Sequence, residues 1–213
     1  MLAFKATDMP LLLRDEKEHE LFAHLSDPDQ NQEEYARLMQ QESVELGASL
    51  GIDLPEGYEL RMIEHRNEEK ELEIFVLNHE TKRVALFNRI EKTNYHLDGI
   101  SDKPVKQAMI WRQNRKADSV ATRDVVEAVF FRKLVHEYNI VVSDCEQTRN
   151  GKRMWERLLD IAIDTEGLMA AVGDAINGKV TRIHNEKELA AQEKWLWGQM
   201  DFHRERLAVI ASV

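Results

Sequence analysis

The sequence predicts an α+β domain, and three observations carry that prediction. Apolar and polar residues alternate, as in half-buried strands, over Tyr58–His65, Leu72–Leu77 and Arg83–Ile90. Segments before and after these strands space their apolar residues three and four apart, which is the helical period. Asn177-Gly178 between two apolar runs is typical of a tight hairpin. Together these patterns favour a mostly antiparallel central sheet with helices on both faces.

The length and composition indicate one globular domain. The chain has 213 residues, of which 43% are hydrophobic and 32% are charged, a balance that supplies enough apolar surface to offset the entropy of folding. We therefore expect a single domain over residues 1–213. A helical N-terminal portion, residues 1–54, is expected to pack on the sheet of a core formed by residues 55–213.

The charge balance argues against general binding to nucleic acids. The 29 Lys and Arg residues face 39 Asp and Glu residues, a formal net charge of −10, whereas non-specific affinity for DNA or RNA comes from cations that neutralise phosphates. Mimicry of DNA by an acidic surface ranks last among the functional hypotheses, because lysines interrupt the acidic runs.

Cysteine usage and hydropathy indicate the compartment. Cys145 is the only cysteine, so no internal disulfide can form and a reducing environment is expected. No apolar run approaches the ~20 residues of a membrane span. The sequence therefore predicts a cytoplasmic protein that does not bind membranes.

The N-terminal portion is predicted to hold two helices between Asp15 and about Ile52. The first ends near Ser26-Asp27-Pro28-Asp29, and Gly51 ends the second. The expected apolar stripe of the second helix comprises Tyr35, Leu38, Met39, Val44, Leu46 and Leu50.

Beyond the three-stranded meander, the sequence predicts alternating strands and helices. The expected elements are a strand Val105–Arg112, a basic loop Arg112–Ala121, a helix from an N-cap at Thr122 to about Tyr138, and a strand Ile140–Ser143. A helix then begins at Thr148 or Asn150 and carries an apolar stripe from Trp155 to Ile163.

The C-terminal part is predicted to contain a two-residue type I′ hairpin at Asn177-Gly178, with both residues at positive φ. The flanking strands are expected within Leu168–Ile176 and Lys179–Ile183. Asn185 can cap a helix from Glu186 to about Trp197, and Leu207–Ile210 is expected to form a final strand.

Three groups of residues could carry chemistry. Ser143 and Asp144 end a core strand, where a nucleophile or a polar site can face a crevice, although closing the turn is the favoured explanation of both residues. The cations Arg112, Arg115 and Lys116 could hold the phosphates of an anionic cofactor, or could belong to an exposed loop. None of the eight histidines has a ligand spacing, and six of them lie in different predicted elements, so no metal site is predicted. The six are His65, His79, His96, His136, His184 and His203.

Trp195 and Trp197 are the candidates for a protein interface. On a helix they point about 200° apart, so one is expected to enter the core while the other covers a neighbour or meets a partner protein.

The segment from Ser143 to Leu158, of the form SDxxQTxxGxxMWxxL, resembles a pattern in uncharacterised phage-encoded proteins with a GNAT acetyltransferase-like domain. The predicted order of helices, meander, strand, helix, strand, helix and terminal hairpin is similar to that fold. The resemblance covers about two thirds of the chain.

This resemblance implies an N-acyltransferase with acetyl-CoA as its cofactor. Tyr138, Ser143 and Asp144 would then line the catalytic cleft, with Tyr138 as a candidate general acid, and Arg112, Arg115 and Lys116 would contact the cofactor. The family holds the pyrophosphate with a glycine-rich Q/R-x-x-G-x-G/A loop, whereas here that place is RQNRKADSVATRD. The acetyl-CoA site is therefore expected to be atypical or lost.

The alternative hypothesis is a non-enzymatic protein, either a structural component of a virion or an inhibitor that binds a host factor. The acidic charge, the Trp195/Trp197 pair and the missing glycine loop all permit this alternative. The expected location is the host cytoplasm for a phage-encoded enzyme or inhibitor, and the virion for a structural protein.

Overall fold

The computed structural model describes residues 11–12, 22–65, 70–142, 146–147, 149–197 and 206–213, in which the chain forms two compact units. The first unit comprises the described parts of Met1–Lys17, Thr93–Gln107 and Glu137–Val213, and the second comprises those of Glu18–Lys92 and Ala108–His136. Strand β6 (Val105–Arg112) contributes its first three residues to the first unit and the rest to the second. The described chain is α+β, with mostly antiparallel strand pairs.

The second unit contains the predicted meander. Its elements before β6 are α1 (Ala23–Ser26), α2 (Pro28–Gln40), β2 (Val44–Glu45), α3 (Gly47–Leu50), β3 (Tyr58–Glu64), β4 (Lys70–Asn78) and β5 (Arg83–Lys92). Strands β2 to β5 pair in sequence order, each pair antiparallel. The alternation in the sequence therefore located all three predicted strands, and the turn after Asn78 joins β4 to β5 as expected.

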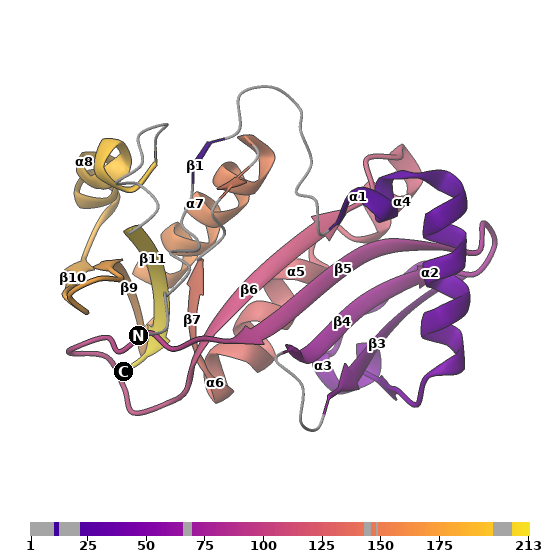
Figure 1. Ribbon diagram of the computed structural model, residues 1–213, viewed down its shortest axis with the longest axis horizontal. Helices are drawn as coiled ribbons and strands as arrows, with labels where there is room; N and C mark the ends of the chain where they lie inside the picture. The colour runs from indigo at the N-terminus through magenta and orange to yellow at the C-terminus, as the bar shows by residue number, and fades with distance from the viewer. Residues whose placement is uncertain (1–10, 13–21, 66–69, 143–145, 148, 198–205) are drawn as a thin grey trace, which may run out of the picture. The chain divides into compact units, whose positions relative to one another are not determined.

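Both faces of β4 are covered, since every residue from Leu72 to Asn78 is buried. On the face toward α2, a buried cluster joins Phe22, Leu25, Leu38, Ile63, Phe75, Leu77, Val84, Phe87, Met109 and Trp111. Figure 1 shows α2 and the helix α5 (Val125–Val129) on opposite sides of these strands. The alternating side chains of the meander thus enter two cores, which explains why its polar positions include buried Glu73 and Asn88.

The second predicted helix is shorter than expected. It ends at Gln40, and Val44 and Glu45 form β2 instead, pairing with Met62 and Arg61 of β3. The Glu45 carboxylate accepts the backbone N–H of Gly47 and so closes the turn into α3. Met39 and Val44, assigned to the buried stripe, are 42% and 59% exposed. Pairing with β3 outweighs helical propensity here, although Gly51 does end a helix, with φ +61°.

The segment Arg112–Ala121 is a loop only in part, since residues 113–115 alone lie outside helices and strands. Residues Lys116–Ala121 form the helix α4, and Thr122 is its C-cap rather than the N-cap of the next helix. The Thr122 hydroxyl is fully buried and donates to the backbone oxygen of Asp118 at 2.8 Å. Three short elements follow: α5, the π-helix η2 (Phe130–Leu134) and α6 (Val135–Glu137). These three elements are contiguous, so the expected helix to about Tyr138 is confirmed from Val125 to Glu137, with a π-helical stretch inside it.

In the first unit, the C-terminal strand lies between two other strands of the sheet. After β6 this unit contains β7 (Asn139–Val142), β8 (Glu146–Gln147), α7 (Arg149–Asp164), β9 (Leu168–Asp174), β10 (Val180–Ile183), α8 (Glu186–Leu196) and β11 (Arg206–Ser212). β8 pairs with β1 (Leu11–Leu12). Strand β11 inserts between β7 and β9, antiparallel to both, while β6 and β7 are parallel. Leu207–Ile210 is thus confirmed as strand, and Trp155, Leu158, Leu159 and Ala162 form the predicted buried stripe of α7.

The hairpin between β9 and β10 has a different turn from the predicted one. Gly178 has φ +71°, but Asn177 does not take positive φ, so the turn is not type I′. The connection spans five residues because the Asp174 carboxylate accepts the backbone N–H groups of Ile176 and Asn177. The N-cap at Asn185 is confirmed, since its side chain accepts the N–H of Glu188 at 2.9 Å.

Candidate functional site

The three predicted cofactor-binding cations lie where β6 meets α4. Arg112 ends β6, Arg115 occupies the N-cap position of α4 without a side-chain capping bond, and Lys116 begins the helix. All three side chains are exposed. This arrangement leaves them available to an anion, but on a short helix rather than on an open loop.

A buried polar cluster fixes α4. Asp118 is 3% exposed, and its carboxylate accepts hydrogen bonds from the Tyr58 hydroxyl at 2.9 Å and from the Asn78 amide at 2.8 Å. Asn78 also donates to the Tyr58 oxygen at 3.0 Å, and its own oxygen accepts the N–H groups of Glu80 and Thr81 in the β4–β5 turn. One carboxylate therefore ties the helix that carries Lys116 to both β3 and β4.

This cluster alters the acidity of Tyr58. Burial, and then the hydrogen bond and charge of Asp118, raise the pKa of the phenol from 10.0 to about 12. Because the folded chain retains this proton longer than the unfolded chain does, the cluster stabilises the fold fully below about pH 10 and loses that contribution as the pH rises to about 12.

Tyr58→Phe is expected to remove the pH dependence that the ionisation of Tyr58 gives to the stability of the fold. The difference in unfolding free energy between wild type and Y58F should shrink as the pH rises from about 10 to about 12, because only the wild type has a phenol to ionise there. Urea denaturation at each pH measures the difference. A difference that stays constant over this range would contradict the assignment.

Tyr138, the predicted general acid, is half-buried immediately before β7. The ammonium of Lys106 lies 5.6 Å from the centre of its ring, a cation–π contact between the residue preceding β7 and strand β6. The other two predicted catalytic residues, Ser143 and Asp144, lie outside the described residues, as do Cys145 and Thr148. Tyr138 belongs to the first unit and the three cations to the second.

Trp195 and Trp197 differ in burial as expected. Trp197 is 5% exposed and belongs to the core, while Trp195 is partly exposed and carries the Arg206 guanidinium 4.3 Å above its ring. Arg206 is also paired with Asp174. Trp195 therefore covers a neighbouring strand, and its role in meeting a partner protein stays a prediction.

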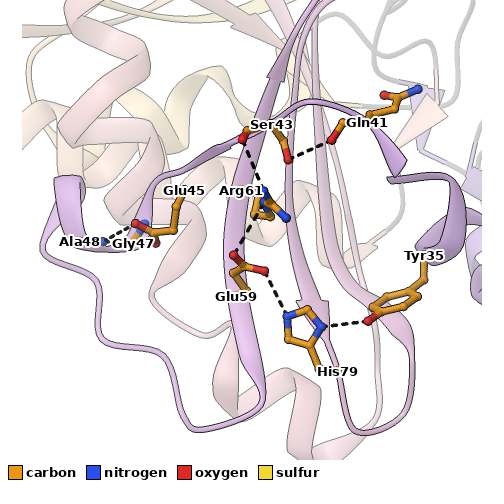
Figure 2. Close-up of polar contacts among 9 residues, drawn as sticks. All are labelled: Tyr35, Gln41, Ser43, Glu45, Gly47, Ala48, Glu59, Arg61 and His79. Atoms are coloured by element: carbon orange, nitrogen blue, oxygen red, sulfur yellow. Dashed lines mark hydrogen bonds and ion pairs between the residues drawn. The ribbon is translucent and has the colours of Figure 1, made fainter. Parts of the chain in front are cut away.

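A chain of polar side chains in the second unit was not foreseen. The Tyr35 hydroxyl of α2 lies 2.9 Å from Nδ1 of His79, and Nε2 of His79 lies 3.1 Å from a carboxylate oxygen of Glu59 on β3 (Figure 2). Arg61 continues the chain: its Nε is 3.7 Å from the other Glu59 oxygen, and its Nη2 donates to the Ser43 backbone oxygen at 3.4 Å. Three separate elements thus bring a phenol, an imidazole and a carboxylate into line.

A second ion cluster lies farther along the same strands. The buried Glu73 carboxylate of β4 is 3.2 Å from Arg37 on α2 and 3.2 Å from His65. Arg37 also makes two hydrogen bonds to Glu34, at 2.6 and 2.7 Å. This cluster attaches the end of α2 to the sheet.

The sequence predicted no functional site at His65 or His79. A signal for the second was present, because Glu59 and Arg61 alternate on one face of a predicted strand whose hairpin partner ends at Asn78, next to His79. The contact of His79 with Tyr35, by contrast, follows only from the position of α2 in the fold. Within the described ranges, no three His, Cys, Asp or Glu side chains lie close enough together to hold a metal ion.

Comparison with protein-family models, curated proteins and solved structures yields no match. Over the described part of the chain, no helix has the length and apolar character needed to cross a membrane.

Proposed function

We propose that this protein is a GNAT-like protein of the phage-encoded type that binds an acyl-CoA through side-chain cations and transfers the acyl group to an amine. The observation that carries the proposal is the parallel pair of β6 and β7, formed by Val105–Asn139, Lys106–Ile140 and Gln107–Val141. It is a parallel ladder among mostly antiparallel ones, and a helical segment joins its two strands, as the resemblance to the GNAT fold requires.

The short ladder supports a cofactor at this place. Its pairing stops at Gln107, while β6 continues for five more residues to Arg112. In acyltransferases of this kind, the corresponding two strands separate and the cofactor enters between them. The proposal therefore assigns the acyl-CoA to the carboxyl end of β6, in the second unit.

The phosphates of the cofactor need a different anchor from that of the family. Arg112–Ala121 contains no glycine, and buried Asp118 holds α4 against β3 and β4, so a backbone cradle would require this helix to unwind. Exposed Arg112, Arg115 and Lys116 supply three positive charges instead. Binding through such side chains weakens as salt screens the charges.

Titration calorimetry with acetyl-CoA tests the proposal. We expect saturable binding that weakens about tenfold or more in the triple variant R112A/R115A/K116A, a loss of about 1.4 kcal/mol or more. Arg123→Ala, which removes an exposed cation just beyond α4, is the matched control and should leave the affinity unchanged. Absence of binding at millimolar acetyl-CoA would refute the proposal that the protein is an acyltransferase.

One observation favours the alternative of a non-enzymatic structural or inhibitory protein. The anchored α4 lies in the segment that the resemblance matches to the family's glycine-rich loop. A site lost in this way would leave a fold that can act by binding alone. Under this alternative, acetyl-CoA does not bind, and light scattering after size exclusion shows a stable complex with a host or virion protein.

A further inference from the structure

The chain formed by Tyr35, His79 and Glu59 has a defined direction for its protons. A carboxylate can only accept a hydrogen bond, so neutral His79 carries its proton on Nε2 and donates it to Glu59. Nδ1 then has a free lone pair, and the Tyr35 O–H donates to it at 2.9 Å. This is the connectivity of a hydroxyl nucleophile, an imidazole base and a carboxylate that orients the base.

Neighbouring groups hold this arrangement in place. Arg61 faces the Glu59 oxygen that His79 does not use, and is itself bound to the Ser43 backbone. The Tyr35 ring packs beside the buried cluster under α2 and meets the His79 ring edge to face, with 6.0 Å between the centroids. The side chains of His79 and Glu59 remain 36% and 32% exposed, so a reagent in solution can reach the base.

We propose that Tyr35 is a nucleophile that accepts an acyl group from an activated ester or thioester, with His79 as its general base. The Tyr35 oxygen forms a bond to the acyl carbon, and the bond from that carbon to the leaving oxygen or sulfur breaks. The phenolic proton passes to Nδ1 of His79 and from there to the leaving group, which yields an O-acyl tyrosine. Glu59 and Arg61 are positioning residues.

The base has to act during the attack rather than before it. Burial, and next the charge of Glu59, raise the pKa of Tyr35, so the resting side chain is a neutral phenol. A positioned base that removes the proton in the transition state accelerates such an attack by about 10²–10⁴-fold.

Tyr58 provides an internal control. Its hydroxyl is also partly buried and hydrogen-bonded, but to the Asp118 carboxylate and the Asn78 amide, with no imidazole among these partners. A difference in acylation rate between Tyr35 and Tyr58 therefore reports the contribution of His79.

Acylation by p-nitrophenyl acetate, followed by peptide mass spectrometry of the folded protein, tests this proposal. We expect Tyr35 to be acetylated about tenfold or more faster than Tyr58. His79→Ala should bring the Tyr35 rate down to that of Tyr58, and Glu59→Gln should lower it by less, because the imidazole base remains. Thermal unfolding checks that both variants fold.

Equal rates at Tyr35 and Tyr58 in the wild type would overturn the proposal, as would a Tyr35 rate that is unchanged in a folded H79A variant. If H79A does not fold, two other results test the proposal. These are the Tyr35 rate in E59Q, which should be lowered, and the comparison of Tyr35 with Tyr58 in the wild type. The probe contains no coenzyme A, so the outcome is independent of the acetyl-CoA titration.

Discussion

Replacing Asn31 with alanine is expected to lower the free energy of unfolding by about 3 to 5 kcal/mol, because three buried hydrogen bonds end on this side chain. Its amide nitrogen donates to the backbone oxygens of Leu25, at 2.7 Å, and Val84, at 3.2 Å. Its oxygen accepts the Val84 N–H at 2.8 Å. Asn31 is completely buried, so water cannot replace these partners.

Equilibrium unfolding in urea measures the effect. Gln32→Ala is the matched control, since Gln32 is exposed on the same helix and should change the stability by less than about 0.5 kcal/mol. A loss below about 1 kcal/mol in N31A would mean that the backbone groups of Val84 find other partners.

Asp118→Ala is expected to cost about 2 to 4 kcal/mol and to loosen α4. The variant leaves the Tyr58 hydroxyl and the Asn78 amide without their shared acceptor, at a position where Asp118 is only 3% exposed. Hydrogen exchange should then accelerate at the amides of α4, and urea unfolding should show the loss of stability.

Asp118→Asn separates the role of the acceptor from that of the charge. The amide oxygen can still accept from Tyr58 and Asn78, so a loss of about 1 kcal/mol is expected. If D118A and D118N are equally destabilised, the negative charge rather than the accepted hydrogen bonds holds the helix.

The strands were the most predictable part of the fold. Val105–Arg112 was predicted with the observed bounds, and alternation located β3, β4 and β5. The N-cap at Asn185 was also correct. These features depend on neighbouring residues and on burial with a period of two, which a single sequence displays directly.

The errors arise where a distant residue decides the local structure. Thr122 looks like an N-cap, but buried Asp118 stabilises the turn before it. Asn177-Gly178 looks like a two-residue turn, but the Asp174 carboxylate binds the turn N–H groups and lengthens it. The β2 pairing at Val44 likewise needs β3 as its partner.

The candidate sites show the same limit. Arg112, Arg115 and Lys116 are neighbours in sequence, so their common position was predictable, whereas the helix that carries them was not. The hydrogen-bonded chain of Tyr35, His79 and Glu59 joins residues that lie up to 44 positions apart in the sequence. Its members became recognisable only after α2 had been placed against the meander.

The alternation of the chain between the two units limits how the protein can be divided. Thr93–Gln107 belongs to the first unit, Ala108–His136 to the second, and the chain after His136 to the first again. Hydrolysis of any one peptide bond therefore cannot release either unit as a single complete fragment. A protein engineer who wants the second unit alone must join residues 18–92 to residues 108–136 with a new linker, which cuts β6 after its third residue.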